Sequence, residues 1–412
     1  MPYPAQSTLG IYVSIPFCRS KCTYCNFASG VYSASEHEHY IERALADLRG
    51  AGEWGVRMDV ELPRRVDTIY LGGGTPTLLA PALLARLVAA IRSEFDVDPG
   101  AEFTVECAPG QLADETLNAL IACGVNRVSL GVQSFVDREA AVSGRLHHCA
   151  DVVEDLRRLR AAGIANINVD LIAGLAGQTA ASWEESLAAL IGSDVPHASV
   201  YMLEVDENSR LGRELLARGS RYFAGLVPSD DAVARMYSSA IEQLSAAGRS
   251  QYEISNFARP GFASRHNLRY WRRRPYLGLG LDASSALPSR PAHGLPFDAR
   301  PRPVLRSTTT SDLKAYLDGQ CEREIEWLSS ARQHEEAWFL GLRLSSGVNI
   351  REIEREFGSE MLAQAMSVVD RMTSQGLLSF DGATVWLTAR GKLLSNEVFQ
   401  EFIELEPALP VV

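Results

Sequence analysis

Three cysteines near the start of the chain are the residues best placed to do chemistry. The segment Phe17–Phe27 reads FCRSKCTYCNF, which sets Cys18, Cys22 and Cys25 at a C-x3-C-x2-C spacing within one loop. Thiolates are the usual ligands of iron–sulfur clusters, and four of them would close a four-iron cluster. Three thiolates therefore predict a 4Fe–4S cluster with one iron open to an outside ligand, much as a catalytic zinc keeps an open position.

Other uses of these thiols fit less well. A structural zinc site needs a second pair of ligands nearby, but the next cysteine, Cys107, stands alone. A thioredoxin-like C-x-x-C pair would leave Cys18 unexplained. Simple buried cysteines rarely occur three in so short a segment. The remaining cysteines are predicted to be core or surface thiols: Cys107, Cys123, Cys149 and Cys321.

A glycine run provides a second candidate binding element. Gly72, Gly73, Gly74 and Thr75 directly follow the short apolar run 68–71. Glycines let a ligand lie against the backbone, whose N–H groups can bind a carboxylate. Polar residues also stand at or just past the ends of later strand-like runs, namely Glu106, Gln133 and Asp170. Arg145 is the nearest cation that can face a carboxylate. Loop capping, and for Arg145 an ordinary surface position, are the alternatives.

The elements that must position these residues alternate between two patterns. Short β-rich runs are predicted as strands over 11–15, 68–71, 102–106, 127–131, 166–171 and 198–203. Segments with helical spacing lie between them, over 37–49, 81–95, 114–123, 151–162 and 180–191. This alternation predicts an α/β fold, a partial (β/α)6 TIM-like barrel with a parallel sheet. In such barrels the C-terminal mouth of the strands holds the chemistry, which is where the candidate residues gather.

The second half of the chain changes character. A helix is predicted over 231–247, then an aromatic and basic stretch over 251–286, and an exposed loop rich in Pro and Arg over 288–310. Helices over 335–344, 350–357 and 360–375 precede a small hairpin, which predicts a winged-helix-like C-terminal domain. The expected domains are a barrel over 1–230, a connecting region over 231–330 and this helical domain over 331–412.

Charge and cysteine content restrict the function. The net charge is −11, and residues 331–412 hold 7 Lys and Arg against 12 Asp and Glu, so nucleic-acid binding is not expected. A packing or lid role suits the C-terminal domain better. Seven scattered cysteines do not form a disulfide framework, which predicts the reducing cytoplasm. The sequence MPYPAQSTLG is not a secretory signal, and no run of apolar residues is long enough to insert into a membrane.

Several strings in combination resemble the radical S-adenosylmethionine (SAM) superfamily. They begin with Tyr12 in IYVSIPF, the cysteine triplet and GGGTP. The strings RVSLGVQSF, VDLIAGLAGQT, YEISNFARPG and HNLRYW are similar to the coproporphyrinogen-oxidase-like branch, and within it to the radical SAM heme chaperones. The resemblance extends over roughly residues 10–395, and it implies the radical SAM type of partial barrel.

The resemblance assigns roles to the candidate residues. It implies that Cys18, Cys22 and Cys25 ligate the cluster and that SAM chelates the open iron. Residues expected around the nucleoside are Tyr12, Gly73, Gly74, Thr75 and Glu106, and those expected along the same cavity are Gln133, Arg145 and Asp170. The reduced cluster would pass an electron into the sulfonium and so generate a 5′-deoxyadenosyl radical. Heme is the third implied ligand, with heme-acceptor proteins and an electron donor as partners.

Two departures favour a heme chaperone over an oxygen-independent coproporphyrinogen oxidase. Such oxidases usually carry a further cysteine two residues after the third ligand, where this chain has Phe27. They also tend to have a longer arm before the cluster. The oxidase remains the alternative, and a radical methyltransferase or ring-opening enzyme acting on heme is a third.

The HNLRYW string is the candidate heme element. His266 is predicted to ligate iron, while Tyr270 and Trp271 stack on the macrocycle. Nearby arginines would pair with propionates: Arg265, Arg269, Arg272, Arg273 and Arg274. The alternative is a buried, hydrogen-bonded histidine beside a solvated basic run. The family often has a histidine where this chain has Ser284, which removes a second possible ligand.

Overall fold

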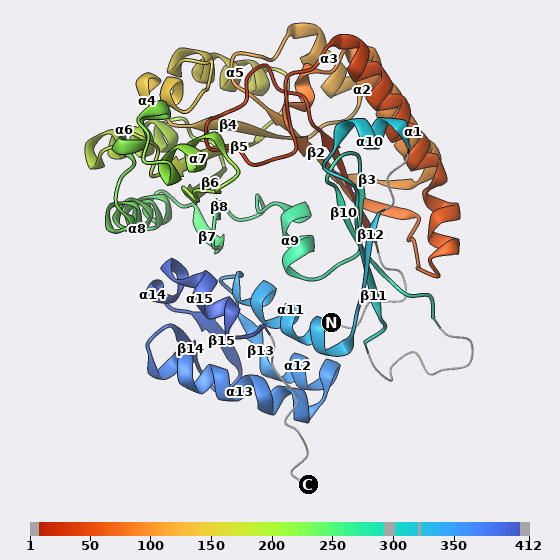
Figure 1. Cartoon of the computed structure of the whole chain (residues 1–412), viewed down its shortest axis with the longest axis vertical. Helices are drawn as coiled ribbons and strands as arrows, with labels where there is room; N and C mark the ends of the chain where they lie inside the picture. The colour runs from red at the N-terminus through yellow and green to blue at the C-terminus, as the bar shows by residue number, and fades with distance from the viewer. Residues whose placement is uncertain (1–7, 292–300, 320–322, 404–412) are drawn as a thin grey trace.

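The barrel is built from six parallel strands that follow one another in the sheet. The structure is a computed structural model, and it describes residues 8–291, 301–319 and 323–403. The strands are β1 (Leu9–Ile15), β2 (Arg65–Gly73), β3 (Asp96–Cys107), β4 (Arg127–Gln133), β5 (Asn166–Ala173) and β6 (His197–Met202). Their outer face is covered by α1 (Ala34–Arg57), α2 (Pro81–Glu94), α3 (Asp114–Ala122), α5 (Cys149–Ala161) and α6 (Ala180–Gly192), as Figure 1 shows. The predicted partial barrel is confirmed.

Alternation along each strand separates an apolar outer face from a polar inner face. In β1, Ile11 and Val13 are fully buried against the helices, while Tyr12 lies between them on the other face. Tyr12 is paired in register with Tyr70 of β2, which in turn donates to Glu106 of β3. Because side chains alternate with a period of two, the functional residues of all strands share the inner face.

The sheet extends beyond the six predicted strands at both edges. Beside β1 it continues through β9 (Tyr276–Leu279), β10 (Ser284–Pro288), β11 (Val304–Thr308) and β12 (Glu324–Leu328). Beyond β6 lie β8 (Asn256–Ala258) and β7 (Ser250–Glu253). The expected loop over 288–310 is wrong over 304–308, because that run pairs with β10 and buries Leu305 completely. Residues 292–300 of the expected loop, and Cys321, lie outside the described residues.

Five further helices precede the C-terminal part of the described chain, and α8 is the longest of them. The chain forms α4 (Asp137–Val142), α7 (Arg210–Leu216), α8 (Asp230–Ala246), α9 (Arg265–Trp271) and α10 (Leu313–Asp318). Helix α9 lies against the start of β2, where Arg269 and His266 both contact Thr68. A methyl group added at Gly10 of β1 would lie 2.4 Å from the Arg269 side chain, so that glycine leaves space for the helix inside the barrel. The helix therefore closes the base of the barrel.

The C-terminal part has a hydrophobic core of its own. It contains α11 (Ser330–Leu342), α12 (Ile350–Phe357), α13 (Ser359–Ser374), α14 (Ala389–Leu393) and α15 (Ser395–Gln400). A small antiparallel sheet, β13 (Val348–Asn349), β15 (Thr384–Leu387) and β14 (Leu378–Phe380), completes the predicted winged-helix-like domain. Trp338, Val369, Val385 and Phe402 are fully buried in this core. Figure 1 shows the domain (blue) beside the open side of the barrel.

No described helix is both long and apolar enough to cross a lipid bilayer. The domain boundaries expected at residues 230 and 330 stay a prediction. Strands from residue 250 onwards join the barrel sheet.

Candidate cofactor site at the mouth of the barrel

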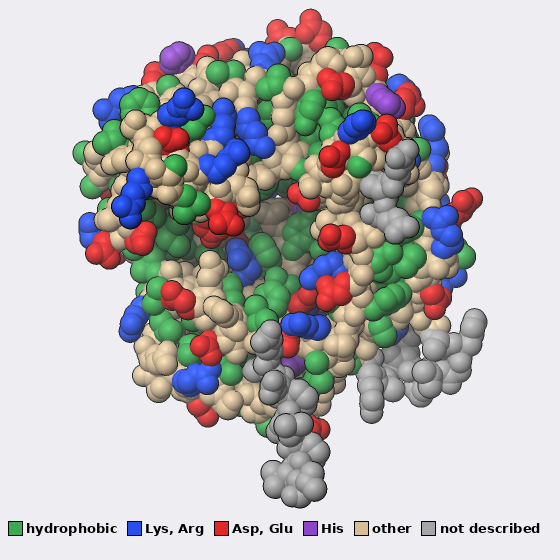
Figure 2. All heavy atoms as spheres, viewed as in Figure 1, with side chains coloured by type: hydrophobic (Ala, Val, Ile, Leu, Met, Phe, Trp, Pro, Cys, Tyr) green, Lys and Arg blue, Asp and Glu red, His purple; other side chains and the backbone are tan. Residues whose placement is uncertain are grey.

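A cavity of about 850 Å³ lies at the C-terminal mouth of the strands. It is lined by ten of the twelve predicted site residues: Cys18, Cys22, Cys25, Gly73, Gly74, Thr75, Glu106, Gln133, Arg145 and Asp170. Figure 2 shows the surface hollowed near the middle of this face, with acidic and basic side chains around the hollow. The volume lies in the upper part of the range of small-molecule sites, about 300–1,000 Å³.

The cysteine loop is held by backbone hydrogen bonds to three other segments. Thr75 N–H donates to Phe17 O (2.7 Å) and Thr23 N–H donates to Ser143 O (3.0 Å). Leu211 N–H donates to Thr23 O (2.8 Å), which ties the loop to α7. The loop is therefore positioned by the glycine run, by the segment after β4 and by α7, before any ligand is considered.

Gly74 allows the glycine run to approach this loop closely. A methyl group added at Gly74 would lie 2.7 Å from Phe17 O and 2.8 Å from Phe17 N, and neither backbone atom can move aside cheaply. We expect Gly74→Ala to lower the free energy of unfolding by about 1–3 kcal/mol, the usual cost of overpacking. Urea unfolding measures this. Gly100→Ala, at a site with open space, is the matched control and should change little; equal losses in both variants would contradict the tight contact.

Arg145 places a cation beside the cysteine loop. Its Nη1 donates to Cys22 Sγ at 3.6 Å, and its Nε is buried with no acceptor among the residues that the structure describes. A methyl group at Gly131 of β4 would lie 2.5 Å from Nη2, so the guanidinium lies across this glycine. A buried guanidinium with an unused donor favours a nearby hydrogen-bond acceptor, and an anionic acceptor most strongly. The side chain thus fits a cluster with thiolate ligands and an adjacent ligand carboxylate.

Two buried carboxyl groups line the inner wall. Glu106 accepts from Gly73 N–H (3.0 Å) and from the Tyr70 hydroxyl (2.9 Å). Burial, opposed by these hydrogen bonds and reinforced by the charge of Asp170, raises the pKa of Glu106 to about 7. Burial also raises the pKa of Asp170, although that carboxylate accepts from Asn168 Nδ2 at 2.7 Å. Desolvated carboxylates of this kind favour a positively charged ligand.

Gln133 has a strained backbone, and Tyr12 lies behind the cavity wall. Gln133 adopts φ 70°, a left-handed conformation that is costly for a side chain other than glycine, beside an irregularity in the pairing of β4 with β5. Tyr12 is absent from the cavity lining. A methyl group at Gly73, which has φ +100°, would lie 3.4 Å from the Tyr12 hydroxyl, so Tyr12 lies under the glycine run.

The three thiols line one cavity without converging on a single point. In the described ranges, no group of three His, Cys, Asp or Glu side chains converges closely enough to hold one metal ion. A single zinc ion needs its ligands around one point, whereas a four-iron cluster presents a different iron to each thiolate. The wide, shared cavity beside Arg145 is consistent with the larger group.

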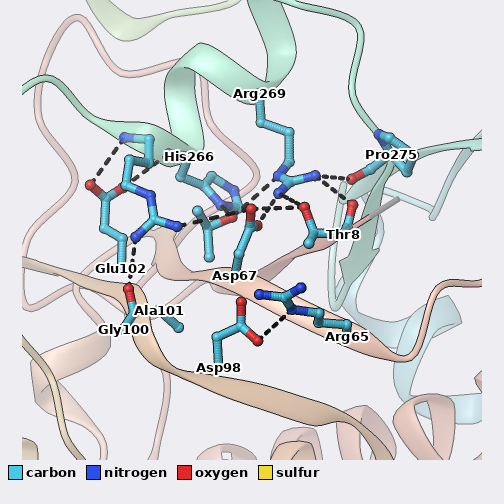
Figure 3. Close-up of polar contacts among 12 residues, drawn as sticks. Thr8, Arg65, Asp67, Asp98, Gly100, Ala101, Glu102, His266, Arg269 and Pro275 are labelled. Carbon is cyan, nitrogen blue, oxygen red and sulfur yellow. Dashed lines mark hydrogen bonds and ion pairs between the residues drawn. The ribbon is translucent and has the colours of Figure 1, made fainter. Parts of the chain in front are cut away.

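His266 lies in the base of the barrel, away from the cavity lining. Its side chain is 1% exposed, and its two ring nitrogens lie 2.9 Å from Thr68 Oγ1 and 2.8 Å from the Tyr270 hydroxyl. Figure 3 shows that the Glu102 carboxylate accepts hydrogen bonds from the first N–H groups of α9. The distance from His266 N to Glu102 Oε1 is 2.9 Å. Burial lowers the pKa of His266 to about 3, so the ring is neutral. The predicted heme ligation is not available in this arrangement, because both nitrogens are already engaged.

Loss of His266 should therefore damage the fold rather than ligand binding. We expect His266→Ala to lower the free energy of unfolding by about 2–5 kcal/mol, as for truncation of a buried, hydrogen-bonded side chain. Chemical denaturation measures the loss. Heme affinity of the folded fraction should stay within about twofold of the unchanged protein; selective loss of heme binding at normal stability would restore the ligand role.

The rest of the HNLRYW string also has structural partners. Arg269 forms an ion pair with Asp67, visible in Figure 3, and donates to Pro275 O at 2.8 Å. The Tyr270 ring packs edge-on against Tyr276, with centroids 4.6 Å apart. These contacts correct the expectation that Tyr270 stacks on heme and that Arg269 pairs with a propionate. Ser284 bonds the Thr308 hydroxyl at the start of β10 and does not line the cavity.

Sequence reasoning missed the C-terminal contribution to the cavity. Residues of the far domain complete its lining, namely Arg343 and Leu393, Leu394, Ser395, Asn396 and Glu397. Tyr237 and Ser255 of the connecting region also contribute. These residues have no distinctive spacing, and only the predicted lid role of the domain pointed towards them.

Comparison with known proteins relates this geometry to a family. Residues 12–190 match the radical SAM superfamily model, and residues 328–394 match the HemN C-terminal domain. Heme chaperone HemW of Lactococcus lactis is 33% identical over 95% of this chain and 96% of its own. Heme chaperone HemW of Escherichia coli is 30% identical over 96% of this chain and 98% of its own. The chain belongs to the HemW family of radical SAM proteins.

HemW family membership agrees with the fold. The solved structure of coproporphyrinogen III oxidase (HemN) from Escherichia coli matches with a TM-score of 0.78 and 22% identity, covering 97% of this chain and 91% of that one. That likeness shows a shared architecture of barrel and C-terminal domain. Membership of the radical SAM superfamily implies a 4Fe–4S cluster and SAM.

Proposed function

We propose that this protein is a heme chaperone whose barrel mouth binds a 4Fe–4S cluster, SAM and heme. The observation that carries the proposal is the near full-length likeness to proteins named heme chaperone HemW, at 33% and 30% identity. The cavity supports it, because it joins the cysteine loop to surfaces of the C-terminal domain that a nucleoside alone would not need. Transfer of the bound heme to acceptor proteins completes the function.

The proposal gives each group of cavity residues a role. Cys18, Cys22 and Cys25 hold the cluster. Gly73, Gly74 and Thr75 border the space for SAM, with their N–H groups already donating to Glu106, Ile15 O and Phe17 O. When bound, the cluster and SAM would together provide one-electron chemistry at the sulfonium centre of SAM. The electron would come from an external donor. The inner wall is a preorganised polar surface: Glu106 and Asp170 attract the cationic part of SAM, and Arg145 neutralises the thiolates. Tyr12 supports the glycine run from below, and Gln133 borders the same space.

Phe27 favours heme handling over porphyrin oxidation. This side chain is 62% exposed and lines the cavity, at the position where the resemblance predicts a further cysteine in the oxidases. An exposed aromatic ring offers apolar area for a flat macrocycle. It has no thiol to contribute to electron or hydrogen transfer.

An assay of both activities tests the function. The anaerobically reconstituted protein is incubated with reductant and SAM, and with either heme or coproporphyrinogen. We expect heme loaded on the protein to pass to an apo-heme protein, with no formation of protoporphyrinogen. Accumulation of protoporphyrinogen would establish the oxidase instead, and 5′-deoxyadenosine release that depends on heme, with heme consumed, would establish a heme-modifying enzyme.

The remaining expectations belong to the same proposal. A cytoplasmic location follows from the scattered cysteines, and the absence of nucleic-acid partners follows from the net charge of −11. An electron donor is needed only if SAM is cleaved.

A further inference from the structure

Four basic side chains line the cavity, and one of them comes from the C-terminal domain. Arg19 and Lys21 belong to the cysteine loop, and Arg145 contacts Cys22. The fourth is Arg343, which directly follows α11 in the C-terminal domain. It lines the cavity together with Ile254 and Ser255 of the connecting region. Nothing in the cluster or SAM site described above uses Arg343.

Backbone pairing fixes Arg343 in this place. Ile254 N–H donates to Arg343 O at 3.1 Å, and Ser345 N–H donates to Tyr252 O at 3.0 Å. The guanidinium lies over the Trp271 ring, with its central carbon 4.2 Å from the ring centroid. An arginine that is stacked on an aromatic face is preorganised, so it loses little conformational freedom when it binds an anion.

The hydrogen-bonding capacity of this guanidinium is poorly used. Its contact with Glu253 is long, at 3.5 Å from Nη2 to Oε2. Its Nε is buried and has no acceptor among the described residues. Glu253 is fully buried and its other oxygen already accepts from Ser255 N–H at 2.9 Å. A buried N–H donor without an acceptor is costly, and an anionic ligand in the cavity would relieve that cost at Arg343.

Attachment of the C-terminal domain does not depend on Arg343 alone. Arg273 pairs with Glu356 of α12 at 2.8 Å and lies over the Phe357 ring. Arg306 of β11 pairs with Glu336 of α11 at 2.5 Å. These short ion pairs join barrel and domain outside the cavity lining. Arg343 therefore differs from them, because its side chain is 24% exposed, faces the cavity and has only one long contact with a carboxylate.

We propose that Arg343 binds a propionate of the cargo heme and so sets the orientation of the macrocycle. The inference rests on the proposed function, since it takes heme as the occupant of the cavity. A guanidinium can pair with a carboxylate through two parallel hydrogen bonds, and each heme carries its two propionates on one edge. The barrel side of the cavity offers apolar contacts for the rest of the ring, through Phe27, Leu146 and Val205, which are 62%, 59% and 42% exposed.

The test compares heme with heme dimethyl ester, in which the carboxylates are masked. Both are titrated into the reconstituted holoprotein and followed by Soret absorbance. The unchanged protein should bind heme roughly 10-fold or more tightly than the ester, as expected for a charge-assisted hydrogen bond. Arg343→Gln should bind both ligands with the affinity of the ester. Arg306→Gln, which removes an ion pair to the same helix outside the cavity, should keep the full preference for heme.

Glu253→Gln provides an independent test, because it should raise heme affinity where Arg343→Gln lowers it. It removes the carboxylate that competes for Arg343, so heme affinity should rise about threefold or more while ester affinity stays unchanged. This variant decides the matter if Arg343→Gln does not fold. A purely structural Arg343 predicts instead that both variants lower stability and leave the heme-to-ester ratio as it was, which would overturn the inference. Failure of the unchanged protein to bind either porphyrin would refute the proposed function itself.

Discussion

Replacing Cys22 by serine is expected to abolish the cluster and, with it, binding of SAM. A serine hydroxyl is a poor ligand for iron compared with a thiolate, and three ligands leave none to spare. Iron content after anaerobic reconstitution should fall from about four per chain to near zero. SAM affinity should fall by about 100-fold or more, because the open iron that chelates it is lost.

Cys149→Ser is the matched control for this experiment. Cys149 is a partly buried free thiol at the start of α5 and is not part of the cavity lining. The control should keep its iron, its visible absorbance and its affinity for SAM. Full iron content in Cys22→Ser, or equal losses in both variants, would contradict the assignment of the cluster to the cysteine loop.

Glu106→Gln should weaken SAM binding and remove its dependence on pH. In the unchanged protein the pKa of Glu106 is about 7, raised mainly by burial and also by the charge of Asp170, so the carboxyl ionises across the neutral range. SAM carries a positive sulfonium, which favours the ionised form. We expect SAM affinity to rise between pH 6 and pH 8 in the unchanged protein, and to fall roughly 10- to 100-fold in the variant at pH 8. Anaerobic calorimetric titration at each pH measures this.

The free energy of unfolding of the ligand-free protein should fall as pH rises, whereas SAM affinity should rise. The pKa of Glu106 is raised from 4.5 to about 7, so between these values the folded protein keeps a proton that the unfolded chain releases. Stability therefore falls as pH rises through this window, and the cost is fully present above it. Glu106→Gln should lack this contribution and be more stable than the unchanged protein at pH 8. Equal pH dependence of SAM binding in both proteins would exclude Glu106 as the titrating group.

Local spacing made the barrel mouth predictable from sequence. The cysteine triplet, the glycine run and the strand-end residues Glu106, Gln133 and Asp170 each follow a strand whose alternation is clear, and the mouth of a parallel barrel gathers them. The structure places them on one cavity. Strands β7 to β12 were missed because they are short, and because prolines obscure the alternation around β11.

Tertiary packing decided the residues that the sequence could not place. His266 has the chemistry of an iron ligand, but only the approach of Thr68 and Tyr270 shows that both ring nitrogens are occupied. Arg343 has no motif around it, and its relevance comes from a contact between parts of the chain that are far apart in sequence. Burial and pairing across such distances are not encoded in local periodicity.

Heme titration of the reconstituted protein shows directly whether this chain binds heme. The anaerobically prepared holoprotein is titrated with heme at micromolar concentrations while the Soret band is recorded. We expect a saturable band with one heme per chain, retained in His266→Ala and weakened in Arg343→Gln. No saturable binding by the cluster-loaded protein would contradict the assignment as a heme chaperone.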